Sequence, residues 1–82
     1  MRIMMSVKKM IDMYVEYGLS NETWDMMYEM TCHNLISRDN WTKFFNKCKS
    51  WYFNEETNTI DDGDTGKTIY VYDDKGNLHK VA

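Results

Sequence analysis

An apolar residue precedes a serine at three points along the chain, and a second apolar residue follows each serine by four positions. The three instances are Met5-Ser6 with Met10, Leu19-Ser20 with Trp24, and Ile36-Ser37 with Trp41. Serine is a preferred helix N-cap, and apolar residues in these flanking positions close a hydrophobic staple. The pattern therefore predicts three helices, each beginning directly after its serine.

Apolar residues recur at helical spacing behind each serine, so each predicted helix has one apolar face. The second helix is expected over residues 21–34 and the third over 38–50, while Gly18 stands where a left-handed cap ends the first. Because large rings fill a small core well, these faces are interpreted as core. They comprise Val7, Met10, Ile11, Tyr14 and Tyr17; then Trp24, Met27, Tyr28, Thr31 and Leu35; and finally Trp41, Phe44, Phe45, Cys48 and Tyr52.

The pattern changes after Phe53. Residues 54–66 hold five acids and no base, which predicts an exposed loop or a weak outer strand. Residues 68–72 and 78–81 then read as two strands of a hairpin, with Gly76 free to take a positive φ in the turn between them. An isolated hairpin is marginally stable, so a third strand is expected from either residues 59–60 or residues 2–4.

The expected fold is α+β, with three short amphipathic helices followed by a C-terminal antiparallel hairpin. Its 82 residues suit one domain, made of a three-helix part (1–53), an acidic loop (54–66) and the hairpin (67–82). The apolar share of 43% and charged share of 28% are those of a globular chain.

The sequence offers no catalytic, cofactor or metal signature, so we expect no enzyme. Residues 63–68 end like a phosphate-binding loop but lack its first glycine and lead into a strand. Cys32 and Cys48 are too far apart for a clustered metal site and are expected to be buried, reduced thiols. His33 and His79 have no acid or thiol partner that local structure would bring close, so both are expected at the surface.

The N-terminal residues include no apolar run long enough for a signal peptide, so a reducing cytoplasm is expected. The composition, with no Pro and four Gly against six Tyr, favours AT-rich codons. A low-GC bacterium, or one of its phages or mobile elements, fits that usage. The expected location is then the cytoplasm of the bacterial host.

Charge is unevenly distributed along the chain. The net charge of −3 divides into +1 for residues 1–53 (7 basic, 6 acidic) and −4 for residues 54–82 (3 basic, 7 acidic). The second helix carries only acids, whereas the third carries four bases against one acid. The molecule is therefore electrically dipolar, which bears on the kind of partner it meets.

The leading hypothesis is a small non-enzymatic protein-binding domain that inhibits a host nucleic-acid-handling protein, such as a nuclease or polymerase. An anti-CRISPR-like inhibitor fits this description. Methionines on an acidic helix face suit protein binding, and loop acids compete for a phosphate-binding groove. The candidate residues are Asp25, Met26, Glu29, Met30, Glu55, Glu56, Asp61, Asp62, Asp64, Tyr70 and Tyr72. Whether the methionines and the two tyrosines are exposed or covered stays open at this point.

A competing hypothesis follows from the order of elements, which resembles a winged helix-turn-helix. The resemblance implies DNA binding by the third helix, through Arg38, Asn40, Lys43 and Lys47. The acidic hairpin side opposes it, because each acid near phosphate weakens the electrostatic attraction. A structural or assembly component of a phage particle is the third reading, and the oligomeric state is undetermined.

Overall fold

The computed structural model describes residues 4–81 and confirms the α+β class. Three helices come first, namely α1 (Val7–Glu16), α2 (Asn21–Cys32) and α3 (Arg38–Cys48). Four strands follow: β1 (Trp51–Asn54), β2 (Thr59–Asp62), β3 (Thr68–Tyr72) and β4 (Leu78–Lys80). The chain divides into two compact units, Met1–Lys49 with the helices and Ser50–Ala82 with the sheet.

All three predicted serine caps are confirmed. The hydroxyl oxygens of Ser6, Ser20 and Ser37 accept hydrogen bonds from backbone N–H groups three residues later, at 3.1, 3.3 and 3.0 Å. Each bond satisfies one of the N–H groups that the first turn of a helix leaves without a partner. The helix starts therefore lie where the sequence pattern predicts them.

The first two helices end in the same hydrogen-bonded motif. After α1, Gly18 takes φ +71°, and Leu19 N donates to Tyr14 O at 2.9 Å. After α2, Asn34 takes φ +62°, and Leu35 N donates to Met30 O at 2.9 Å. Both are Schellman caps, in which a left-handed residue closes the helix. Gly18 was expected in this role, whereas Asn34 was not.

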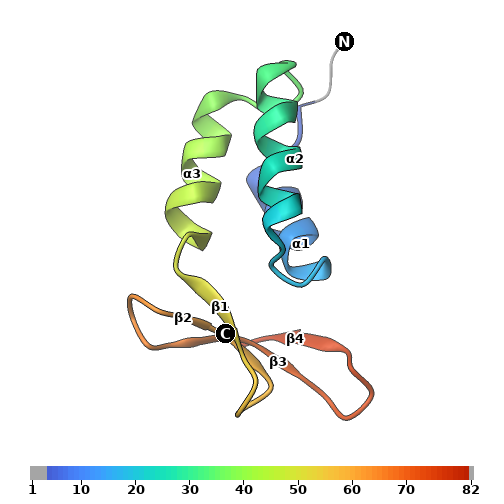
Figure 1. The fold of residues 1–82 in the computed structure, drawn as a ribbon, viewed down its shortest axis with the longest axis vertical. Helices are drawn as coiled ribbons and strands as arrows, with labels where there is room; N and C mark the ends of the chain where they lie inside the picture. The colour runs from blue at the N-terminus through green and yellow to red at the C-terminus, as the bar shows by residue number, and fades with distance from the viewer. Residues whose placement is uncertain (1–3, 82) are drawn as a thin grey trace. The chain divides into compact units, whose positions relative to one another are not determined.

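In the helical unit, α2 and α3 run side by side in opposite directions with α1 beside them (Figure 1). Met10, Met27 and Phe44 are fully buried between the three helices. The rings of Tyr14 and Phe44 meet edge to face, with centroids 5.6 Å apart. Each helix thus contributes at least one large side chain to a common core, which is what the amphipathic pattern predicts.

The predicted core faces are wider than the core that forms. Tyr17, Tyr28, Leu35 and Phe45 were assigned to it, yet their exposed fractions are 59%, 58%, 42% and 43%. Helices of 10 to 12 residues cover only part of one another's apolar arc, so the residues at the edge of each arc stay in solvent.

The third helix is shorter than predicted and a strand was missed. Helix α3 ends at Cys48, and Trp51 begins β1. Tyr52, expected on the helix face, therefore lies in a strand. A run of aromatic residues satisfies helical and strand patterns equally, so its periodicity could not decide between them.

The sheet is an antiparallel meander in the order β1-β2-β3-β4. Strand β2 is central, and Thr59, Ile60 and Asp61 within it are buried. The expectation of a loop or weak outer strand over 54–66 is therefore wrong for this strand, although a third strand through residues 59–60 is confirmed. The alternative third strand over residues 2–4 falls mostly on positions outside the described residues.

The predicted hairpin is confirmed as β3 and β4, with Tyr72 opposite Leu78. Gly76 takes φ +81° in the connecting turn, as expected. On one face of the sheet the rings of Trp51 and Tyr70 approach to 6.0 Å between centroids. A bulge between Ile60 and Asp61 shifts the pairing of β2 with β3.

Candidate protein-interaction surfaces

Met26 lies beside a hollow at the turn between α1 and α2. This hollow, of about 330 Å³, is lined by Tyr17, Ser20, Glu22, Thr23 and Met26, and we call it the Met26 hollow. Met26 is 39% exposed and Tyr17 is 59% exposed. Two large side chains with apolar bodies thus border a concave site that also carries a carboxylate.

Two residues that line the Met26 hollow are joined by hydrogen bonds. The hydroxyl groups of Ser20 and Thr23 lie 2.8 Å apart, and Thr23 N donates to Ser20 Oγ. Thr23 is buried. The Schellman cap at Gly18 fixes the chain that leads from Tyr17 into this turn. The hollow is therefore preformed by local backbone structure.

Glu22 lines the Met26 hollow, and two further carboxylates are exposed on α2. Glu22, Asp25 and Glu29 are exposed, and Met30 is half-buried one turn after Met26. Glu22 lies in the first turn of the helix, where a negative charge is favourable. Of the four α2 residues predicted for protein binding, Asp25, Met26 and Glu29 are thus exposed and Met30 is partly covered.

The acids of residues 54–66 do not form one surface. Glu55, Glu56 and Asp64 are exposed and Asp62 is half-buried, but Asp61 is only 8% exposed. The assignment of Asp61 to an exposed acidic surface needs correction, because this residue lies in the central strand and faces other side chains of the sheet.

Asp61 is held by side chains from its own strand and from both neighbouring strands. Asn54 Nδ2 donates to Oδ2 at 3.0 Å, while the hydroxyls of Thr59 and Thr68 donate to Oδ1 at 2.8 and 2.9 Å. These donors lower the pKa of Asp61, the bond from Asn54 most of all. The network cross-links β1, β2 and β3, so its role is structural.

Tyr70 and Tyr72 are half-buried members of the sheet's aromatic face. Tyr72 meets Phe53 with ring centroids 5.7 Å apart, as Tyr70 meets Trp51. Phe53 itself is 42% exposed. Both tyrosines of β3 therefore pack on rings of β1 across the intervening strand β2, and neither projects as an isolated anchor.

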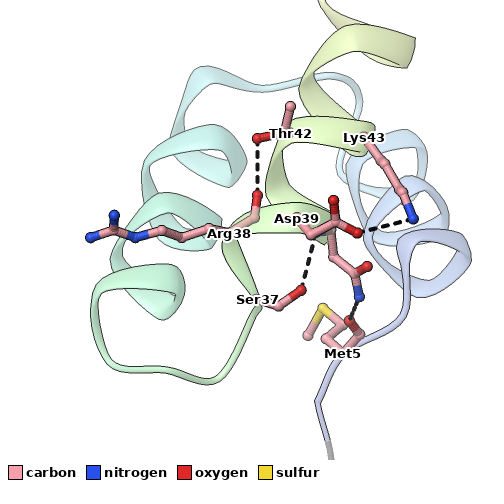
Figure 2. Close-up of polar contacts among 7 residues, drawn as sticks. Met5, Ser37, Arg38, Asp39, Thr42 and Lys43 are labelled. Atoms are coloured by element: carbon pink, nitrogen blue, oxygen red, sulfur yellow. Dashed lines mark hydrogen bonds and ion pairs between the residues drawn. The ribbon is translucent and has the colours of Figure 1, made fainter.

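Of the four residues considered for DNA binding, Arg38 lies on a different side of α3 from the other three. Asn40 is half-buried, and its Nδ2 donates to Met5 O at 3.1 Å. Lys43 pairs with Asp39 at 3.0 Å. Figure 2 shows Arg38 and Lys43 extending in opposite directions from the helix. Arg38 and Lys47 are exposed. Arg38 thus points away from the side of α3 that Asn40, Lys43 and Lys47 share by helical spacing, and DNA binding through that side stays a prediction.

A second surface was missed by sequence reasoning. Trp24, Tyr28, Trp41 and Phe45 form a continuous row across α2 and α3, which we call the aromatic strip. Ring centroids lie 5.5 Å apart for Trp24 and Trp41, 5.8 Å for Tyr28 and Trp41, and 5.6 Å for Trp24 and Phe45. Its two ends, Tyr28 and Phe45, are exposed, so the strip reaches the surface. The helical spacing of these four aromatic residues was recognised in the sequence, but all four were assigned to the core.

Two further expectations need correction. His79 Nε2 lies 2.8 Å from Asp73 Oδ2, because the hairpin turn brings positions six apart together. This contact is the main cause of a lowered pKa at Asp73. Cys32 is exposed rather than buried, while Cys48 is buried as expected, and neither forms a disulfide.

Over residues 4–81, no group of three or more His, Cys, Asp or Glu side chains is placed to hold a metal ion. The helices of this same part of the chain are all too short or too polar to cross a membrane. No family model, curated protein or solved structure matches the chain.

Proposed function

We propose that the chain is a non-enzymatic protein-binding domain that docks through the Met26 hollow onto a basic surface of its partner. The observation that carries this proposal is the pairing of exposed Met26 and Tyr17 around a hollow of about 330 Å³. Flexible methionine and amphipathic tyrosine side chains are favoured at protein interfaces. They supply apolar contact area, which the domain would bury against its partner.

The charge around the hollow supports a basic partner. Glu22 lines it, and Asp25 and Glu29 lie exposed on the same helix. Carboxylates around an apolar centre steer a positively charged surface toward it and fix its orientation. Proteins that handle nucleic acids carry such surfaces where phosphate binds. The proposed role, in a phage or mobile element, is therefore inhibition of a host nuclease or polymerase by occupying that surface.

The exposed and half-buried acids of the sheet unit are a second source of the same attraction. Glu55, Glu56, Asp62 and Asp64 remain candidates for this role, whereas Asp61 does not. Changing Asp62 and Asp64 to Asn should weaken target binding without unfolding the sheet. Unchanged affinity in that variant would remove the sheet acids from the proposal and leave the Met26 hollow alone.

The test is capture of partners from a low-GC host lysate, with and without nuclease, using the wild-type protein and two variants. Met26→Lys should abolish retention of the specific partner, because it places a cation among the carboxylates. Lys47→Met is the matched control on an exposed residue of α3 and should leave retention unchanged. Equal retention by Met26→Lys would contradict the proposal. Retention that disappears with nuclease would favour the DNA-binding alternative.

A further inference from the structure

We infer that the aromatic strip is an interface between two copies of this chain. The strip does not line the Met26 hollow, and the inference goes beyond the proposed function. Tyr28 and Met26 point about 160° apart on α2, since successive helical residues turn by about 100°. The strip and the Met26 hollow therefore lie on different sides of α2.

The strip has the composition of an interface centre. Its two ends, Tyr28 and Phe45, are 58% and 43% exposed, and Trp24 and Trp41 between them are half-buried. Large aromatic rings dominate the energetics of protein interfaces. Next to Trp41 the surface has a hollow of about 420 Å³, which Tyr28 and Arg38 also line. A row of rings with an adjacent hollow can receive a protruding ring from another molecule.

The charges beside the strip differ between its two edges. On the α2 edge, Asp25 follows Trp24 and is exposed. On the α3 edge, Lys49 lies over the ring of Phe45, with Nζ 5.9 Å from its centroid. Arg38 lies on this same edge, where it lines the hollow beside Trp41. One edge of the strip is therefore acidic and the other basic.

That charge pattern is complementary to itself. Helices α2 and α3 lie side by side and antiparallel (Figure 1). A two-fold axis parallel to both helices would place α2 of each copy against α3 of the other, without changing the level along the helices. Asp25 would then lie near the ammonium group of Lys49 of the second copy, because Asp25 follows Trp24, Trp24 contacts Phe45, and Lys49 Nζ lies over the Phe45 ring. A two-fold axis perpendicular to the helices would instead oppose acid to acid. The charges therefore favour the dimer whose two-fold axis is parallel to the helices.

The interface is small, because it rests on four aromatic residues already packed on one another. Interfaces of this kind lie at the low end of the size range and are weak. We therefore expect a dimer that dissociates in the range of roughly ten to one hundred micromolar, which corresponds to a modest association free energy.

Sedimentation velocity over a concentration series tests the inference. The wild-type protein should shift from monomer to dimer as its concentration rises. Tyr28→Ser with Phe45→Ser should weaken association by at least about tenfold, as expected when central aromatic residues are removed. Tyr17→Ser is the matched control, because this tyrosine is equally exposed but lies outside the strip. Circular dichroism confirms that each variant is folded.

A charge exchange gives a second, independent readout. Asp25→Lys and Lys49→Glu should each weaken the dimer, and the double variant should recover it, since the exchanged charges face one another again. A monomeric wild-type protein at every concentration would overturn the inference and leave the strip to a different partner. A dimer unaffected by the strip variants would overturn it as well. Neither outcome affects the Met26→Lys capture experiment.

Discussion

Thr68 on β3 donates its hydroxyl hydrogen to the carboxylate of Asp61 on β2 at 2.9 Å. Thr59 and Asn54 donate to the same carboxylate. A buried carboxylate is stable only when hydrogen bonds replace the water it has lost. Asp61 is therefore a structural residue that joins three strands, although it stands in the most acidic part of the sequence.

The stability of the sheet should consequently depend on acid pH through Asp61. Its pKa in the folded protein lies below the ordinary value of 3.8, so the unfolded chain takes up the proton first. The stabilisation is complete above that ordinary value and is lost as the pH falls through the lower folded pKa. Denaturant unfolding measured at a series of pH values from about 6 to about 2 checks this, because that range spans the ordinary carboxyl pKa values.

Asp61→Asn provides the comparison for that experiment. The variant should be less stable at neutral pH and should lose less stability in acid than the wild-type protein does. Asp64→Asn is the control, because Asp64 is exposed. The same acid dependence in Asp61→Asn and wild type would show that other carboxyl groups govern it, with Asp73 the next candidate since its pKa is also lowered.

The serine cap of α3 should be a measurable source of stability. Ser37→Ala removes the hydroxyl that accepts from Asn40 N at 3.0 Å. Loss of such a cap costs about 1 kcal/mol in the free energy of unfolding. Thr42→Ala is the control in the same helix, because its hydroxyl only adds a bond to a carbonyl within the helix. Urea unfolding of the two variants should separate them, and an equal loss in both would count against the cap.

The left-handed residue after α2 predicts a pair of opposite effects. Asn34 takes φ +62°, a conformation that costs a residue with a Cβ about 1 kcal/mol. Asn34→Gly should therefore keep or raise the free energy of unfolding, whereas Asn34→Val should lower it by about 1 to 2 kcal/mol. Thermal unfolding followed by circular dichroism measures both. A more stable valine variant would contradict the Schellman cap described here.

The two cysteines should differ in reactivity. Cys32 is exposed and Cys48 is fully buried. A thiol reagent should therefore modify Cys32 rapidly in the native protein and Cys48 only on unfolding. Mass spectrometry of the modified peptides identifies which is which. Rapid modification of Cys48 under native conditions would show that the helical core opens readily.

Local signals in the sequence predicted the helical part well. Each helix start depends on a serine and its neighbours, so Ser6, Ser20 and Ser37 could be identified without knowledge of the rest of the fold. The hairpin turn at Gly76 was predictable for the same reason. The first strand was not, because Trp51 to Phe53 fits a helix and a strand equally, and only its pairing with β2 decides.

The candidate surfaces were harder to predict, because exposure depends on how much of a helix its neighbours cover. Tyr28 and Phe45 follow the core period yet lie outside the core. Asp61 shows the reverse, since an acid in a polar segment is buried by pairing across strands. His79 and Asp73 meet only because the turn between them closes. Periodicity identified the faces, and tertiary contacts determined which parts of each face remain accessible.

The central claim is that the Met26 hollow binds a basic surface of a partner protein. The most direct measurement compares partner retention by the wild-type protein and by Met26→Lys, in nuclease-treated host lysate, with Lys47→Met in parallel. One specific protein should be retained by the wild type and by Lys47→Met and should be absent with Met26→Lys. Retention of the same protein by all three would contradict it.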